Sequence, residues 1–235
     1  MRRCLVPLFL FFALVAATPE VTEEYPVVVV VPLGEPSEDL VEFIAESLKE
    51  RFRFTVRVAD PEPLPDFAWY QPRQRWRAEK LLTHLKQMDL GEAWRVTGIT
   101  EEPISTTKGK RYDYGIAGLA DMDGKASVLT SYLFRRVKQK NRKRYLRYME
   151  NLVIHEVGHT LGLDHCPLVR CIMADAKGNA LKAARLSINE FCPRCTRLIR
   201  RHLRDHKVKG KWSKRERAIL KKHSLREETE YMEGE

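Results

Sequence analysis

One short stretch, HEVGHTLGLDH, which begins at His155, restricts the fold of this chain more than any other feature. On a helix, His155 and His159 lie one turn apart and project from the same face. Two imidazoles on one face can hold one zinc ion, and Glu156 beside them is placed to take a proton from a water molecule. Gly162 can adopt the left-handed conformation that ends a helix, which would turn His165 toward the metal as a third ligand. The stretch therefore requires a helix that ends in a sharp turn.

Chance and an ordinary structural role are the alternatives to a metal site. A histidine by itself is more often structural than a ligand, so each of the three alone would be read as a hydrogen-bonding core residue. For this composition, H-E-x-x-H arises by chance in roughly one chain in fifty to a hundred, and the added glycine and third histidine lower that to roughly one in tens of thousands. The full spacing therefore favours zinc, but it does not distinguish an active site from an intact, unused one.

Four cysteines accompany the motif on its C-terminal side. Cys166 directly follows the third histidine, Cys171 begins a C-x-M turn, and a C-x-x-C pair joins Cys192 to Cys195. The histidine motif in this combination resembles the archaemetzincins, a family of zinc metallopeptidases of the metzincin clan. The resemblance is densest over residues 151–195 and looser in the preceding part of the chain.

The resemblance implies further roles for these residues. Met173 would be the Met-turn residue, which packs beneath the histidines without binding the metal, although filling the core is a simpler role for a methionine. The four cysteines would hold a structural zinc, which implies two zinc ions per chain, one catalytic and one structural. In an oxidising compartment four thiols can instead form disulfides in three connectivities, and the spacing favours zinc over that alternative. Residues 174–191 are one residue longer than the family pattern, which a loop can absorb.

Residues 1–17, MRRCLVPLFLFFALVAA, have the pattern of a secretory signal peptide, with two arginines, an apolar run and small residues at the end. We expect cleavage near Ala17, which removes Cys4 and leaves a secreted, periplasmic or extracellular protein without a membrane span. An uncleaved segment would anchor the protein instead, although the run is short for a permanent span. The apolar run favours general secretion over the twin-arginine route that Arg2 and Arg3 suggest.

After this segment, strands and helices alternate, which predicts an α/β fold with a mainly parallel sheet. A mean hydropathy of −0.42 and 43% apolar residues exclude a multi-span membrane protein and a wholly disordered chain. We expect a single compact metzincin-like domain with a mixed sheet, an antiparallel edge strand, an active-site helix and a zinc-stapled C-terminal subdomain. The expected strands are 27–31, 54–58, 94–104, 114–120 and 127–134, and the expected helices are 37–52, 74–88 and one continuous helix from 135 into the zinc motif.

The formal net charge of +10 is concentrated in two basic runs, residues 135–147 and 197–222. We expect solvated helix faces there, since no recognised nucleic-acid motif accompanies them and no specific nucleic acid is expected as a partner. The other interpretation is contact with an anionic surface or polymer, with Trp212 available for stacking. The expected domain order is signal peptide 1–17, catalytic domain 18–203 and charged C-terminal extension 204–235.

Together these features predict a secreted zinc-dependent metallopeptidase that hydrolyses peptide bonds. Glu156 is expected to act as the general base on the attacking water, beside the catalytic zinc held by the three histidines. By analogy with metzincins, the strand at 127–134 is expected to be the sheet edge on which an extended peptide pairs. The alternative function is a catalytically silent, zinc-stabilised protein that binds polyanions through its basic surface.

Overall fold

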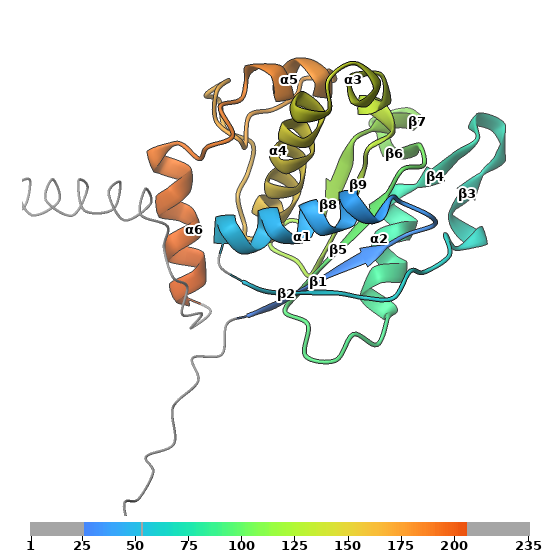
Figure 1. Cartoon of the computed structure of the whole chain (residues 1–235), viewed down its shortest axis with the longest axis horizontal. Helices are drawn as coiled ribbons and strands as arrows, with labels where there is room; N and C mark the ends of the chain where they lie inside the picture. Colours follow the sequence, from blue (N-terminus) through green and yellow to red (C-terminus); the bar gives the residue numbers. More distant parts are fainter. Residues whose placement is uncertain (1–25, 53, 206–235) are drawn as a thin grey trace, which may run out of the picture.

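The computed structural model describes residues 26–52 and 54–205. The expected signal peptide and nearly all of the charged extension lie outside these residues. Within the described ranges, no helix is both long and apolar enough to cross a membrane. Two sheets and six α-helices form one α/β domain (Figure 1). The helices are α1 (Glu38–Phe52), α2 (Ala78–Gln87), α3 (Arg135–Lys140), α4 (Arg142–Thr160), α5 (Ala180–Leu186) and α6 (Pro193–Asp205).

The main sheet confirms the predicted mainly parallel arrangement with an antiparallel edge. Its four parallel strands are followed by one antiparallel edge strand that pairs only with its neighbour in the sheet. In spatial order the strands are β2 (Thr55–Val58), β1 (Val27–Pro32), β5 (Arg95–Thr100), β9 (Ala126–Thr130) and β8 (Gly118–Ala120).

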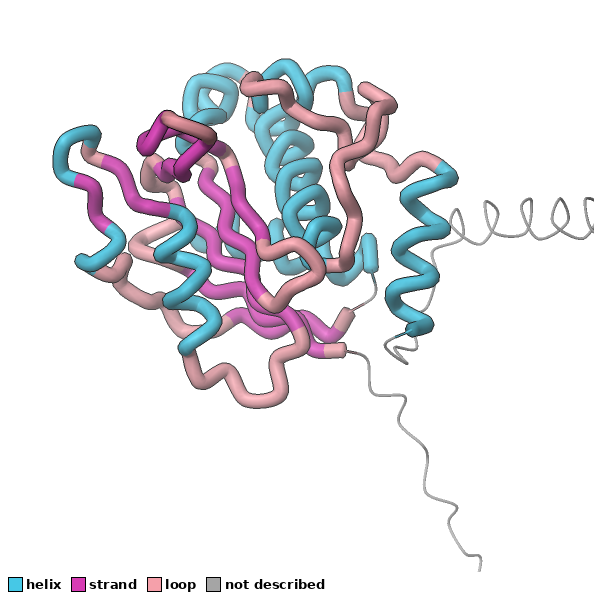
Figure 2. The backbone as a smooth tube through the Cα atoms, turned by 180° about the vertical axis from the view of Figure 1, so that it is seen from behind, coloured by secondary structure: helices cyan, strands magenta, loops and turns pink. Residues whose placement is uncertain are grey.

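Helices cover both faces of this sheet, as the continuous apolar run of β1 requires. Val28 and Val30 belong to the core cluster on the face of α1 and α4, whereas Val29 and Val31 belong to the cluster on the face of α2. Figure 2, seen from behind, shows α2 lying across its face of the strands. The alternation of side chains along β1 therefore joins the two halves of the core.

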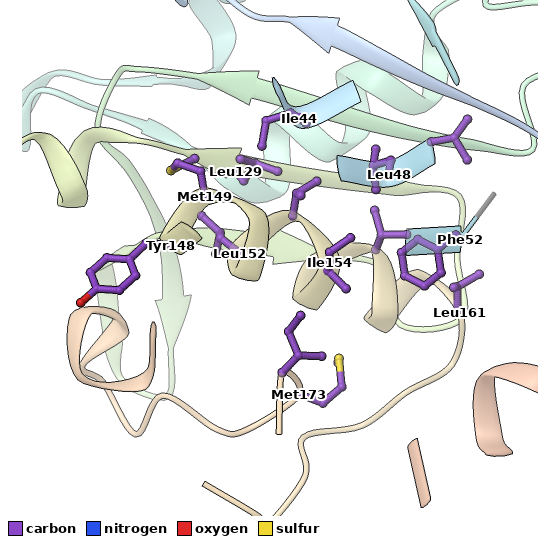
Figure 3. Close-up of a cluster of buried hydrophobic side chains, with 14 of the residues drawn as sticks. Ile44, Leu48, Phe52, Leu129, Tyr148, Met149, Leu152, Ile154, Leu161 and Met173 are labelled. Carbon is purple, nitrogen blue, oxygen red and sulfur yellow. The ribbon is translucent and has the colours of Figure 1, made fainter. Parts of the chain in front are cut away.

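The core beneath α4 holds the helix that carries the zinc motif. Ile44 and Leu48 of α1 face Met149 of α4, and Leu129 of β9 completes the contact (Figure 3). All four side chains are at most 2% exposed, so α4 has one fixed position on the sheet. The opposite side of α4 is thereby turned toward the loops that follow it.

A second sheet, which the hydrophobic pattern does not reveal, lies beside the main one (Figure 1). The predicted helix 74–88 begins later, at Ala78, because the preceding residues form a strand of this sheet. The predicted strand 114–120 is divided at Ala117 between the two sheets. In spatial order the second sheet contains β3 (Trp69–Tyr70), β4 (Arg75–Arg77), β6 (Ile104–Lys108) and β7 (Arg111–Ile116).

A buried arginine explains why this sheet is hidden from sequence reasoning. The Arg77 side chain is 1% exposed and donates hydrogen bonds to the hydroxyls of Ser105 and Thr107 and to the carbonyl of Tyr112. It also forms an ion pair with Glu79. These partners compensate for the desolvation of the guanidinium, so a charged residue occupies a core position.

The single helix predicted from residue 135 is wrong, because the chain forms α3 and α4 with a break at Asn141. Asn141 has an extended backbone conformation, and its side-chain oxygen accepts a hydrogen bond from the backbone N–H of Arg144 at 2.8 Å. An asparagine that caps a helix in this way stabilises a new helix start. The zinc-motif helix therefore begins at Arg142.

The predicted strand 127–134 ends at Thr130 and is not a sheet edge. Tyr132–Phe134 form a 3-10 turn, because Thr130 Oγ1 accepts the backbone N–H of Tyr132 and turns the chain. β9 itself lies between β5 and β8, so both of its backbone edges are already paired. The peptide-pairing role expected of this strand is therefore wrong, and β8 is the edge strand.

Candidate active site

α4 presents His155 and His159 from one face, as their spacing predicts. His155 Nδ1 lies 2.8 Å from the carbonyl oxygen of Ile172, and His159 Nδ1 lies 2.7 Å from that of Leu163. A carbonyl can only accept, so each Nδ1 carries the proton and each Nε2 has a free lone pair. The two Nε2 atoms face each other at 3.1 Å. Two lone pairs at this distance repel unless a cation lies between them, which is the chemistry expected of a metal site.

Gly162 makes the predicted turn at the end of α4. Its φ is +74°, in the left-handed region, and the backbone N–H of Leu163 then bonds back to the carbonyl of Gly158 at 3.0 Å. The reversed chain brings the His165 ring to 4.8 Å from the His159 ring, between centroids. One nitrogen from each of the three imidazoles falls within 4.8 Å of the others.

The two helix histidines are also in a protonation state that suits a metal. Burial, reinforced by the neighbouring His159, lowers the pKa of His155 to about 3. Burial likewise lowers the pKa of His159. Neutral imidazoles are the form that binds zinc, and zinc–nitrogen bonds of about 2.0–2.1 Å place tetrahedral ligands roughly 3.4 Å apart. The donor set and the spacing of its atoms therefore fit a zinc ion.

Glu156 lies next to this group in a dry environment. The residue is 6% exposed, and no described residue donates a hydrogen bond to its carboxylate. Burial raises the pKa of Glu156 to about 8 in the absence of a metal. A carboxylate with such a high proton affinity is suited to accept a proton near neutral pH.

A glycine of the edge strand provides the space for this carboxylate. A Cβ atom at Gly118 of β8 would overlap Oε1 and the carboxyl carbon of Glu156. No sequence pattern marks Gly118, because the close approach arises from β8 passing alongside α4. Gly118 is therefore a site residue that sequence reasoning misses.

Gly118→Ala tests this close approach. We expect kcat for peptide cleavage to fall about a hundredfold, because the added methyl displaces the Glu156 carboxylate by about an ångström. Zinc content should stay at the wild-type value, since the histidines do not contact Gly118. Steady-state kinetics and metal analysis measure the two quantities.

Gly91→Ala is the control for a methyl added away from the site, since a Cβ there meets nothing within 4 Å; its backbone is left-handed, with a φ of +61°, so we expect a slightly lower melting temperature. It should keep wild-type kcat. If Gly118→Ala retains more than half of the wild-type kcat, the packing of Glu156 against β8 does not matter for catalysis.

His155, Glu156 and His165 line a cleft with a cavity of about 210 Å³. One wall is the segment from Tyr114 to Gly118, which leads from the second sheet into β8. The facing wall includes Ala180 and Ala184 of α5. The metal-binding atoms therefore lie in a groove between a sheet edge and a helix, where an extended chain can lie.

Met173 lies beneath the histidines as the resemblance implies. Its side chain is fully buried, and its backbone carbonyl accepts a hydrogen bond from Cys166 at 2.7 Å. A Cβ atom at Gly158 would come within 2.5 Å of the Met173 sulfur, so this methionine packs directly on α4 between the two histidines of the helix. The contact holds the loop that carries Ile172 against the helix.

The four cysteines form a second cluster next to the cleft. Their sulfurs all lie within 4.8 Å of one another, and the Cys166–Cys192 and Cys171–Cys195 pairs are both 3.8 Å apart. All four are free thiols, without a disulfide among them. Four sulfurs at tetrahedral corners, each about 2.3 Å from zinc, lie roughly 3.8 Å apart. The cluster therefore fits a closed zinc site better than the disulfide alternative.

Hydrogen bonds within this cluster favour a thiolate at one position. The sulfurs of Cys171 and Cys195 form a hydrogen-bonded pair at 3.8 Å, and this contact lowers the pKa of Cys171 to about 5. The backbone N–H of Cys192 also donates to that sulfur at 3.4 Å. A thiolate is the form of cysteine that binds metals.

Two further residues, which carry no motif, fix the end of α4. Arg95 Nε of β5 donates to the carbonyl of Thr160 at 3.2 Å, and the backbone N–H of Asp123 donates to that of His159 at 2.9 Å. They satisfy carbonyls that a helix C-terminus leaves unpaired. Sequence reasoning misses them because they come from distant segments.

Known proteins resemble this chain in sequence and in fold. The family described as Peptidase family M54 matches residues 56–201. The archaemetzincin of Haloquadratum walsbyi is 26% identical over 176 residues, which cover 72% of this chain and 97% of the relative. The archaemetzincin of Methanopyrus kandleri is 34% identical over 141 residues, which cover 60% of this chain and 75% of the relative. The crystal structure of archaemetzincin from the latter organism superposes with a TM-score of 0.63 and 28% identity, and covers 77% of this chain and 96% of that one.

Proposed function

This chain belongs to peptidase family M54 and is a zinc metallopeptidase, and we propose that it hydrolyses peptide bonds with Glu156 as general base beside a zinc site of three histidines. The observation that carries the proposal is the convergence of three imidazoles, two of which are held in one tautomer by backbone carbonyls, beside one buried carboxylate at a cleft. An unused site would not need the space that Gly118 leaves for the carboxylate.

His155, His159 and His165 would hold the catalytic ion. When bound, zinc supplies a Lewis acid that lowers the pKa of water and polarises the scissile carbonyl. The carbonyls of Ile172 and Leu163 keep the two helix histidines in the tautomer that directs Nε2 into the cleft.

Glu156 would move the proton. It accepts a proton from the water that attacks the peptide carbonyl, and it then donates that proton to the leaving nitrogen as the C–N bond breaks. Its dry surroundings support this role, because a desolvated carboxylate holds a proton more tightly than one in water. No other described carboxylate lies as deep in the cleft, since Asp175 is exposed at its rim.

The edge strand β8 and the segment before it would bind the substrate backbone. β8 pairs with β9 on one side and is the last strand of the sheet. An extended peptide can add to such an edge by main-chain hydrogen bonds, and this places a peptide bond beside Glu156. β8 thus replaces the strand that the sequence favours for this role.

The four cysteines would hold a second zinc ion, which gives two ions per chain. Their free thiols and tetrahedral spacing support this number. This ion would connect the segment that carries His165 to α6, because Cys166 and Cys171 lie in that segment and Cys195 lies in α6.

The proposal extends to export, in which residues 1–17 act as a cleaved signal for general secretion. Support comes from the apolar run after two arginines. The N-terminal sequence of protein recovered outside the cytoplasm tests it, since cleavage gives a chain that begins near Thr18. A chain that keeps Met1 and stays with the membrane would indicate an anchor instead.

Contact of the exposed basic residues of α3 and the first turn of α4 with an anionic polymer is a weaker proposal. Arg136, Lys140 and Arg144 are exposed there, but none of them lines the active-site cleft. Elution of the full chain from immobilised polyanion tests it. Release at the salt concentration that releases any protein of equal charge would leave only non-specific attraction.

Metal removal tests the proposed function directly. We expect a chelator to abolish cleavage of a broad peptide library, and added zinc but not magnesium to restore it, because imidazole ligands select zinc. Mass spectrometry of the products measures cleavage, and elemental analysis measures the metal. Cleavage that continues in fully metal-free protein would contradict the mechanism.

A further inference from the structure

A second hollow of about 600 Å³ lies against the second sheet and borders the active-site cleft. The two cavities share the residues Tyr114, Gly115, Leu133 and Gly178 as a common wall. The hydroxyl of Tyr114 lies so close to Gly178 that a Cβ there would be 2.5 Å from it. A peptide that lies along the cleft wall can therefore reach into both cavities.

Three arginines line this second hollow, which we call the arginine hollow: Arg73, Arg75 and Arg111. Its one carboxylate, Asp113, lies 3.5 Å from Nε of Arg73 and 3.2 Å from Nη1 of Arg75, both through the same oxygen. Three guanidinium groups against the one carboxylate of Asp113 leave an excess of two positive charges in the hollow. Among the described residues, Arg111 has no carboxylate partner.

The geometry of the hollow is fixed by its own strands. Arg75 lies in β4, and a Cβ at Gly115 would come within 2.9 Å of its Nη1, so the guanidinium lies flat on the β7 backbone. Arg111 begins β7 opposite Lys108 of β6, and both cations approach the ring of Tyr114, at 5.8 and 5.0 Å from its centroid. Lys108 also lines the active-site cleft, so the positive charge continues toward the active site.

We propose that the arginine hollow binds a carboxylate of the peptide substrate and makes this peptidase selective for acidic peptides. The inference rests on the proposed function, because it places the carboxylate on a chain whose scissile bond lies beside Glu156. Guanidinium groups suit this task, since they present paired N–H donors that match a carboxylate. The carboxylate comes from an acidic side chain or from the C-terminus of a short peptide, and the two have the same recognition chemistry.

Two carboxylates on the protein limit the charge that the substrate meets. Asp113 is 9% exposed and is already paired with Arg73 and Arg75. Asp175 lies at the cleft rim, where the hydrogen bond from the backbone N–H of Lys177 lowers its pKa and Lys108 adds to this effect. Four cations against these two carboxylates still leave the groove positive. A basic peptide would be repelled, and an uncharged one would lose the arginine contacts.

The test uses the zinc-loaded full chain and uncharged fluorogenic peptides that carry one Glu, or one Gln, at each position in turn, all with amidated C-termini. We expect the ratio of kcat/KM for Glu over Gln to reach about ten at one position in the wild type. In the double variant Arg73→Gln with Arg111→Gln, the ratio should fall to about one. The matched control, Arg136→Gln with Arg144→Gln, loses the same charge from exposed sites on α3 and α4 and should keep the ratio of ten.

A ratio within one variant does not depend on the fraction of protein that is folded, so misfolding cannot imitate the result. A second arm compares Gln peptides with a free C-terminus and with an amidated one. A preference for the free acid that is lost in Arg73→Gln with Arg111→Gln assigns the hollow to a C-terminal carboxylate, whereas a preference for Glu alone assigns it to a side chain. Ratios below two in both arms, or a preference that survives the double variant, would overturn the inference.

Fluorescence anisotropy of labelled Glu and Gln peptides separates this inference from the proposed function. If no peptide is cleaved but the Glu peptide binds about tenfold more tightly, and only through Arg73 and Arg111, the hollow is confirmed and the mechanism proposed for Glu156 fails. If cleavage occurs without discrimination, the mechanism stands and the hollow does not bind substrate. If neither cleavage nor selective binding is observed, both are wrong.

Discussion

The Glu156→Gln variant is expected to cleave peptides about a thousandfold more slowly than the wild type while it keeps its full zinc content. Glutamine has nearly the same shape as glutamate, so it fits the space beside Gly118, but its amide cannot accept the proton of the attacking water. The metal-binding nitrogens are all on histidines, and the substitution removes none of them. Steady-state kcat and elemental analysis give the two values.

Glu46→Gln is a matched control for this variant. Glu46 is exposed on α1, and within the described part of the chain its one ion-pair partner is Lys49, so its loss should leave kcat unchanged. A Glu156→Gln protein that retains zinc and more than a tenth of the wild-type kcat would show that another group accepts the proton. Loss of zinc together with activity would instead give Glu156 a part in holding the metal site.

The Cys171→Ser variant is expected to bind one zinc ion instead of two and to melt roughly 10 °C below the wild type. Cys171 is 3% exposed, and its sulfur lies 3.8 Å from that of Cys195. Loss of a buried metal ligand costs about 3–5 kcal/mol when the remaining site no longer closes. For a domain of this size each kcal/mol lowers the melting temperature by about 2–4 °C.

Ala174→Ser provides the control, since it adds the same buried hydroxyl three residues away without the loss of a sulfur. It should keep two zinc ions and a melting temperature within a few degrees of wild type. Calorimetry and elemental analysis of both variants measure the effect. Two zinc ions in Cys171→Ser, with an unchanged melting temperature, would show that the cysteines do not form a zinc site.

The parts of the active site that sequence reasoning predicts are those encoded within one helix and one turn. His155 and His159 lie at helical spacing, and Gly162 adopts the left-handed backbone conformation that its position suggests. The break before α4 depends on Asn141, whose capping bond competes with continuation of the helix. Arg77 occupies a core position only because two other strands supply its partners. Gly118 matters only because β8 packs against α4, and no local sequence pattern predicts this tertiary contact.

The fold class was predictable for a similar reason. Buried parallel strands have continuous apolar runs, such as that of β1, which local patterns reveal. The second sheet consists of short strands rich in arginine and aromatic residues, such as Arg75 and Trp76, whose partners are distant in sequence. The domain limits proposed at residues 18, 203 and 204 stay a prediction.

The short chain segment after α4 belongs to both metal clusters, and this makes their occupancies thermodynamically linked. Leu163 and Ile172 bond the two helix histidines through their carbonyls, and Cys166 and Cys171 lie between them. An ion on the cysteines would order this segment, so the histidine site would then bind its ion without the entropic cost of ordering the segment. By reciprocity, an ion on the histidines would favour binding at the cysteine site. When zinc is scarce, we therefore expect such chains to divide mainly into filled and empty molecules, with fewer one-zinc chains than two independent sites would give. Native mass spectra at half saturation would show this division, and a dominant one-zinc species would exclude it.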